Sequence, residues 1–149
     1  MSYSYVIDSD LGLVYYFVAG YITAKELLGL EAAAFNDPAR RPNMKIITDL
    51  QLASVDVDID SIKALLSNNR KLNQTGWELE ATAFVTPNRF LVSLADAYEL
   101  MGNDLPLKLK VCSTLDEAVE WLNLSESKER IFAIHQRLAA DNTPNPHHQ

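Results

Sequence analysis

The densest group of side chains that could bind a metal is the run Asp56-Val57-Asp58-Ile59-Asp60. A calcium loop of the EF-hand type needs a glycine at its sixth position and a glutamate at its twelfth. Counted from the first aspartate, those positions hold Ser61 and Ser67, so the pattern fails at both. Asp58 or Asp60 instead suits the start of a helix, where a carboxylate accepts hydrogen bonds from exposed amides. We therefore expect no metal site in this run.

Side chains of nucleophilic or acid–base type occur singly. Cys112 is the only cysteine, and His135 is the only histidine before the pair His147-His148. A catalytic cysteine needs a neighbouring base and an accessible thiolate, whereas Cys112 ends an apolar run and is expected to be a small buried hydrophobe. We expect His135 to lie on the surface of a helix. No glycine-rich phosphate loop follows a strand, so the sequence predicts no catalytic residue, no cofactor and no enzyme activity.

One group of polar residues is expected to meet at one edge of the sheet, although its members are not close together in the sequence. In open α/β sheets, ligands bind beyond the carboxyl ends of the strands, and here that edge collects Asp49, Thr86, Asn88 and Arg89. Near the start of a helix, Arg89 could hold an anion. The simpler interpretation is that Asn88 caps the helix and Arg89 is solvated. These four residues are the candidate site for a small ligand or a partner.

The elements that position these residues are predicted to alternate. Apolar alternation and turn residues predict strands at 3–7, 11–18, 44–50, 79–86 and 107–112. Two capping boxes begin helices, at Thr23-Ala24-Lys25-Glu26 and Thr114-Leu115-Asp116-Glu117. The first two strands form an antiparallel hairpin, and helical crossovers make the later strands parallel. The predicted fold class is α/β, a mixed sheet in the order β-β-α-β-α-β-α-β-α with an extra C-terminal helix.

Length and charge indicate the domain organisation and the kinds of partner that are expected. Residues 1–124 are predicted to form one domain, 125–140 a helical extension and 141–149 a flexible tail. The net charge of −7, from 20 acidic and 13 basic residues, argues against a nucleic-acid surface and an anionic membrane surface. No apolar run is long enough to span a membrane. A single cysteine and an N-terminus without a basic, apolar signal lead us to expect a soluble cytoplasmic protein.

Several short segments, in this order and spacing, resemble a known family. They are Gly20-Tyr21-Ile22-Thr23, Pro38 to Pro42, Thr48-Asp49-Leu50, Ala83-Phe84-Val85, Leu94 to Tyr98 and Leu115-Asp116-Glu117-Ala118-Val119-Glu120-Trp121-Leu122. Over about residues 3 to 124, the chain resembles the SpoIIAA-like group of bacterial proteins, which is related to STAS domains. The resemblance implies a SpoIIAA/STAS-like mixed sheet and a role in protein–protein contact, without enzyme activity.

The resemblance also implies where a regulatory switch would lie. In STAS domains of the anti-sigma antagonist type, a serine is phosphorylated in an Asp-Ser pair just after the central strand. This chain has Asp49-Leu50-Gln51-Leu52 there, and the nearest serine is Ser54, five positions beyond Asp49. Ser54 is therefore the candidate phosphorylation site, in a sequence that departs from the family pattern.

Three functions remain open, in this order. The first is a non-enzymatic bacterial binding or regulatory module that acts through a protein partner or as a homodimer, for which we expect an exposed apolar face, with Tyr16 exposed. The second is a small apolar-ligand or lipid-binding protein, because the SpoIIAA-like group also resembles the CRAL-TRIO lipid-binding fold. It requires a cavity of about 300–1,000 Å³. The third is an enzyme with an unrecognised site, for which nothing in the sequence argues.

Overall fold

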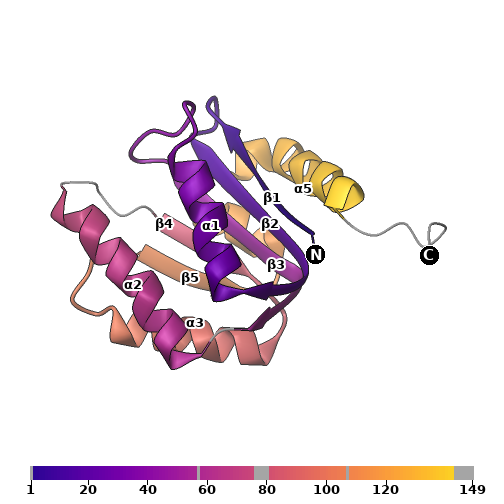
Figure 1. The fold of residues 1–149 in the computed structure, drawn as a ribbon. Helices are drawn as coiled ribbons and strands as arrows, with labels where there is room; N and C mark the ends of the chain where they lie inside the picture. The colour runs from indigo at the N-terminus through magenta and orange to yellow at the C-terminus, as the bar shows by residue number, and fades with distance from the viewer. Residues whose placement is uncertain (1, 57, 76–80, 107, 143–149) are drawn as a thin grey trace.

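The structure, a computed structural model, describes residues 2–56, 58–75, 81–106 and 108–142 (Figure 1). One sheet contains the strands β1 (Ser2–Asp8), β2 (Leu13–Thr23), β3 (Lys45–Asp56), β4 (Ala81–Val85) and β5 (Lys108–Cys112). The helices are α1 (Ala24–Phe35), α2 (Ile59–Gln74), α3 (Arg89–Met101), α4 (Leu115–Trp121), the short 3-10 helix η1 (Ser125–Ser127) and α5 (Lys128–Asn142). The predicted α/β class is confirmed. Residues 79, 80 and 107, predicted as strand, and residues 143–149, predicted as part of the tail, lie outside the described residues.

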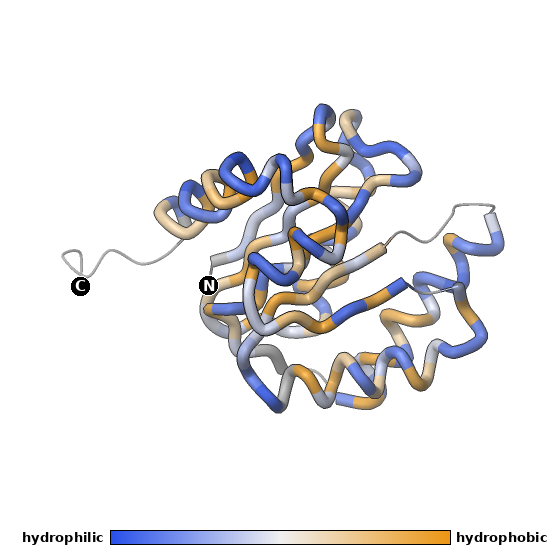
Figure 2. The backbone as a smooth tube through the Cα atoms, turned by 180° about the vertical axis from the view of Figure 1, so that it is seen from behind, coloured by the Kyte–Doolittle hydropathy of each residue, from blue (hydrophilic) through white to orange (hydrophobic). Residues whose placement is uncertain are grey.

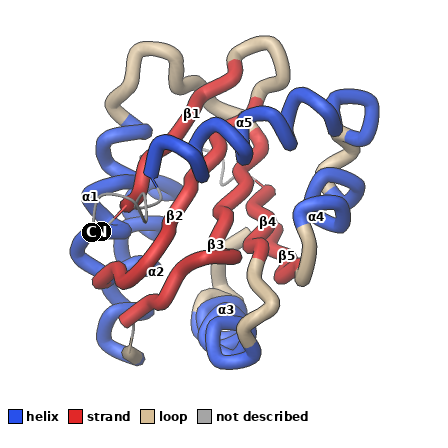
Figure 3. Tube along the Cα trace, turned by 90° about the vertical axis from the view of Figure 1, so that its right-hand side faces the viewer, coloured by secondary structure: helices blue, strands red, loops and turns tan. Residues whose placement is uncertain are grey.

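The sheet has the strand order β1-β2-β3-β4-β5. β1 pairs antiparallel with β2, and all the other neighbours pair parallel, as the sequence predicted. Right-handed crossovers between sequential parallel strands put α1, α2 and α3 on one face. The helices α4 and α5 cover the other face: α4 lies over β4 and β5, and α5 lies over β1 and β2 (Figure 3).

Local side-chain hydrogen bonds begin three of the helices. Thr23 forms the predicted capping box with Glu26, since its hydroxyl accepts from the Glu26 amide and the Glu26 carboxylate accepts from the Thr23 amide. The second box is only half formed, because the Glu117 carboxylate accepts from the amide of Ser113 rather than from that of Thr114. Asp58 caps α2 by accepting a 2.8 Å hydrogen bond from the Ser61 amide.

Two strands run further than predicted. The second strand was predicted to end at Val18 and the third at Leu50, whereas β2 continues to residue 23 and β3 to residue 56. Phe17 pairs with Asp49 and Ala19 pairs with Leu52, so β3 contains one extra residue at this point. Such a bulge bends the strands and lets pairing resume. Gly20 follows it with a φ of 78°, a conformation that glycine adopts without strain.

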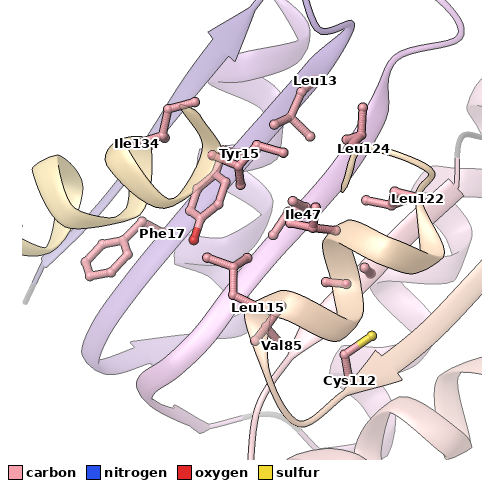
Figure 4. Packing of buried hydrophobic residues seen from close by; sticks show 14 of the residues in the cluster. Leu13, Tyr15, Phe17, Ile47, Val85, Cys112, Leu115, Leu122, Leu124 and Ile134 are labelled. Carbon is pink, nitrogen blue, oxygen red and sulfur yellow. The ribbon is translucent and has the colours of Figure 1, made fainter. Parts of the chain in front are cut away.

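Each face of the sheet has its own apolar core. The core under α4 and α5 includes Leu13, Tyr15, Phe17, Ile47, Val85, Cys112, Leu115 and Ile134 (Figure 4). The core under α1 includes Val14, Tyr16, Val18, Ile22, Leu30 and Met44. The helices mix hydrophilic and hydrophobic residues along their length, whereas the central strands are mainly hydrophobic (Figure 2). Tyr16 is only 7% exposed, so the prediction that it is exposed was wrong: α1 covers its face of β2.

The C-terminal helix α5 packs on the sheet of its own chain. Its buried residues Ile131, Ile134 and Leu138 belong to the same core as Tyr15 and Phe17. Arg130 adds ion pairs to the first hairpin, at 2.7 Å to Asp8 and 3.3 Å to Asp10. Within the described part of the chain, no helix is long and apolar enough to cross a membrane.

Candidate functional site

The most deeply buried charged group of the sheet is the carboxylate of Asp49, which has no exposed surface. Its Oδ2 atom accepts a 2.6 Å hydrogen bond from the Tyr15 hydroxyl and lies 2.6 Å from Nδ1 of His135. Its Oδ1 atom accepts bonds of 3.1 Å from both the backbone and the side-chain amide of Gln51. Both oxygens are therefore satisfied, as a buried carboxylate requires. We call Tyr15, Asp49 and His135 the buried polar cluster.

Three distant elements supply this cluster. Tyr15 lies on β2, Asp49 on β3 and His135 on α5, and the bulge after Asp49 places Gln51 against the carboxylate. The His135 ring meets the edge of Phe17 at a centroid distance of 6.0 Å. The prediction that His135 lies on a helix surface was wrong, since its side chain is only 23% exposed. α5 packs on its own sheet and thereby turns His135 toward Asp49.

The electrostatics of the cluster favour a structural anchor. Burial raises the pKa of the Tyr15 hydroxyl far above its usual value, and the neighbouring Asp49 charge raises this pKa further. Tyr15 therefore keeps its proton and remains a donor to Asp49. Tyr15, Phe17 and Ile134 lie close together in the apolar core (Figure 4). The cluster can thus fix α5 to the sheet by a charge-assisted hydrogen-bond network.

Two of the four residues predicted at the strand ends are buried and two are exposed. Asp49 uses its hydrogen bonds within the buried polar cluster. Thr86 is buried just beyond Val85, the residue that pairs with Asp49, and its hydroxyl accepts from the Asn88 amide at 3.1 Å. Asn88 and Arg89 are exposed at the start of α3. The strand ends therefore place Asp49 and Thr86 in the core and leave Asn88 and Arg89 at the surface.

Two other predicted residues have clear positions. Cys112 is a free, fully buried cysteine in the core under α4, as expected, and burial raises the pKa of its thiol to about 11. Ser54 is exposed in β3, opposite Tyr21 of β2. Ser54 is thus accessible but forms part of a paired strand rather than of a loop.

A large hollow lies on the opposite face of the sheet, between β3, β4, β5 and the helices α1, α2 and α3. This cavity has a volume of about 710 Å³. Its apolar lining includes Tyr16, Leu28, Phe35, Ile46, Leu72, Phe84 and Leu109. Its polar lining includes Glu31, Thr48, Asn68, Asn69, Thr82 and Tyr98, with Arg40, Lys71 and Lys108. The cavity can therefore accept a molecule that is partly apolar and partly polar.

The position of α2 explains why this space is open. α2 packs mainly on α3 and α1 rather than on the sheet, and its buried residues Ile62 and Leu66 join Leu105 in a separate core. A space therefore remains between the C-terminal half of α2 and the sheet.

One wall of the cavity carries an acid. Glu31 of α1 lies in the cavity and keeps contact with solvent there. The surrounding protein raises the pKa of its carboxyl to about 7. Tyr98 lines the cavity too, where burial raises the pKa of its hydroxyl and the charge of Glu31 raises that pKa further. Tyr98 also accepts a hydrogen bond from the side-chain amide of Asn69. A cavity was expected only as a requirement of the second function, and neither its position nor Glu31 was predicted.

The described residues contain no group of three His, Cys, Asp or Glu side chains arranged to hold a metal ion. The chain matches no model of a known protein family, and no curated protein matches it either. Fold and site together define a class in structural terms: an α/β protein with a five-stranded mixed sheet, a buried polar cluster on one face and a partly polar cavity on the other.

Proposed function

We propose that the protein is a non-enzymatic binding module that takes a small amphipathic molecule into the cavity under α2. The observation that carries the proposal is the cavity of about 710 Å³. Its volume lies within the range of about 300–1,000 Å³ that is typical of small-molecule sites. Protein interiors are ordinarily close-packed, so an open space of this size between a sheet and its covering helix favours a ligand.

The distribution of side chains supports an amphipathic ligand. Ile46 and Phe84 give the sheet side of the cavity an apolar surface, while Thr48 and Thr82 place hydroxyl groups beside them. Apolar contact supplies most of the binding free energy in such sites, and a few polar groups fix the orientation. This arrangement reverses the order of the first two functions expected from the sequence.

The test is binding of the neutral fluorescent probe N-phenyl-1-naphthylamine, which becomes bright in apolar surroundings. Ala64 of α2 lines the cavity, so Ala64→Trp fills space that the probe needs. Ala140 of α5 is exposed on the other side of the sheet, and Ala140→Trp is the matched control. We expect saturable binding by the wild type and the control, and a large loss of affinity in Ala64→Trp.

Equal binding by all three proteins would place the probe elsewhere and contradict the proposal, as would no binding by the wild type. Native mass spectrometry of the protein as purified from cells gives an independent measurement. A bound small-molecule mass that Ala64→Trp lacks and Ala140→Trp retains would support the cavity as the site.

A second candidate function, contact with another protein, is favoured by one surface feature. Tyr21 and Leu52 are 51% and 52% exposed. Ala19 pairs with Leu52 and Tyr21 pairs with Ser54, so strand alternation puts Tyr21, Leu52 and Ser54 on one face. Phosphorylation of Ser54 would add charge to this apolar patch. The partner proposed is a second copy of the chain.

Sedimentation velocity over a range of protein concentrations tests this second candidate. We expect a concentration-dependent dimer that the double variant Tyr21→Ser, Leu52→Ser abolishes. A wild-type protein that stays monomeric at every concentration would contradict it. The cavity is formed by other residues, so the two candidate functions can be tested separately.

The proposed function is compatible with a relationship to the SpoIIAA-like, STAS-related proteins, which we also propose. The support is the order of elements, in which a first hairpin is followed by three α–β units and a further helix. An additional support is the set of segments from Gly20 to Leu122 that resemble the family. An experimental structure in which the segments that resemble the family occupy different elements would contradict this relationship.

A further inference from the structure

The charges that line the cavity restrict the chemical class of its ligand. Among the lining residues that the structure describes, Glu31 is the only acidic one. Its carboxylate forms no hydrogen bond and no ion pair with any residue that the structure describes. Two other carboxylates, those of Asp37 and Asp104, have such partners in Tyr5 and Arg70. Glu31 therefore offers an unused acceptor to whatever enters the cavity.

The surroundings of Glu31 would favour a hydrogen-bonding or ionic partner from a ligand. Protein atoms on the cavity walls raise the pKa of its carboxyl to about 7, which means that they solvate the carboxylate less well than bulk water does. Tyr98 lies near enough for the Glu31 charge to raise the pKa of its hydroxyl, in addition to the effect of burial. This part of the cavity thus presents oxygen acceptors and a negative charge.

Among the described lining residues, none of the three cationic ones forms an ion pair with Glu31. The Arg40 guanidinium donates a 2.8 Å hydrogen bond to the carbonyl of Arg41. Lys71 lies in the last turn of α2 and Lys108 is the first residue of β5, and both side chains are exposed. A carboxylate of the ligand beside Glu31 would be repelled, whereas a protonated amine would be attracted and would donate hydrogen bonds.

We propose that the cavity binds an amphipathic amine, a molecule whose apolar body contacts Ile46 and Phe84 and whose protonated amino group pairs with Glu31. This inference rests on the proposed function, because it names the ligand class of the same cavity. It also fixes the sense of the pH dependence. A primary amine stays protonated up to about pH 10, so its binding strengthens as Glu31 ionises through a pH of about 7.

The experiment compares three probes with the same apolar chain: octylamine, octanol and octanoic acid. Each displaces N-phenyl-1-naphthylamine from the full-length protein, and isothermal titration calorimetry measures its affinity directly. A hydrogen bond to a charged group corresponds to at least about tenfold in affinity. We expect octylamine to bind about tenfold more tightly than octanol, and octanoic acid to bind more weakly than both.

Glu31→Gln removes the charge and keeps the size of the side chain. We expect this variant to lose the preference for octylamine, and Glu120→Gln, which changes an exposed carboxylate on α4, to keep it. If octanoic acid binds best, or if Glu31→Gln leaves the preference for octylamine unchanged, the ligand class is wrong while the cavity remains a binding site. If N-phenyl-1-naphthylamine and all three probes fail to bind the wild type, the proposed function fails with it.

Discussion

Replacing Tyr15 with phenylalanine removes one donor from the Asp49 carboxylate and nearly preserves the shape of the side chain. The lost hydrogen bond is 2.6 Å long and ends on a carboxylate with no exposed surface. Hydrogen bonds to charged groups contribute about 1.5–3 kcal/mol. Because His135 and Gln51 still donate to Asp49, we expect the free energy of unfolding to fall by about 2 kcal/mol. For a chain of this length, that corresponds to a decrease in Tm of roughly 4–8 °C.

Urea unfolding followed by circular dichroism measures this loss, and an unchanged m-value would show that the denatured state is the same. Tyr5→Phe is the matched control. It removes a 2.9 Å hydrogen bond from a tyrosine to Asp37, but there water can replace the hydroxyl. We expect a clearly smaller loss in this control. Equal losses in the two variants, or a loss below about 0.5 kcal/mol in Tyr15→Phe, would refute the argument that burial makes the Tyr15 bond important.

The same substitution has a predicted pH dependence. The pKa of Tyr15 is raised in the folded protein above its ordinary value of 10.0, so its contribution to stability is complete below pH 10 and is lost as the pH rises further. One pH unit corresponds to about 1.4 kcal/mol. The stability advantage of the wild type over Tyr15→Phe should therefore shrink by up to about this amount per pH unit above pH 10. An advantage that stays constant there would mean that the hydroxyl titrates alike in both states.

Three further predictions concern other parts of the molecule. Because the pKa of Glu31 is raised from 4.5 to about 7, its contribution to stability is complete below pH 4.5 and lost as the pH rises through 7. The Tm of Glu31→Gln relative to the wild type should thus be higher above pH 7 than below pH 4.5. Cys112 is fully buried and the pKa of its thiol is about 11. Labelling with Ellman's reagent should therefore be slow in the native protein and complete in urea. Thr23→Ala removes the acceptor of the α1 capping box and should lower the free energy of unfolding by about 0.5–2 kcal/mol in denaturant titrations.

Local patterns in the sequence account for most of the fold. The capping box at Thr23 and the alternation of apolar residues depend on residues that are close in the chain, so they predicted the elements and their order. The lengths of β2 and β3 depend on pairing between distant segments. Gly20 pairs with Ala53 beyond a bulge, and a pattern read along one strand does not reveal that pairing.

The buried polar cluster could be predicted only in part. Asp49 was predicted to belong to a ligand or partner site at the carboxyl ends of the strands, but its partner His135 is 86 positions away. A local signal did exist. His135 follows Ile134 and lies four residues after Ile131, so helical spacing puts it beside the buried stripe of α5. Helical spacing does not predict, however, that α5 packs on the sheet of its own chain.

The position of the cavity was not predicted, for a different physical reason. A ligand was predicted at the carboxyl ends of the strands, whereas the cavity is lined by Ile46 and Thr82, which lie near the beginnings of β3 and β4. Its existence depends on the packing of α2 against α3 instead of against the sheet. Tertiary contacts decide whether α2 packs on α3 or on the sheet. The apolar periodicity along α2 would be the same in both arrangements, so it does not predict which one forms.

Adjacent residues of β3 connect both polar features to one strand. Thr48 faces the cavity and Asp49 faces α5, because successive side chains of a strand point to opposite faces. β3 is covered by helices on both faces, and a strand in that position is ordinarily apolar. The polar residues Thr48 and Asp49 therefore each need an explanation. Asp49 is explained by its four hydrogen bonds. A ligand explains Thr48 better than stability does, because its hydroxyl faces an open space. Substitution of Asp49 should therefore chiefly lower the free energy of unfolding, whereas substitution of Thr48 should chiefly lower the affinity for the ligand.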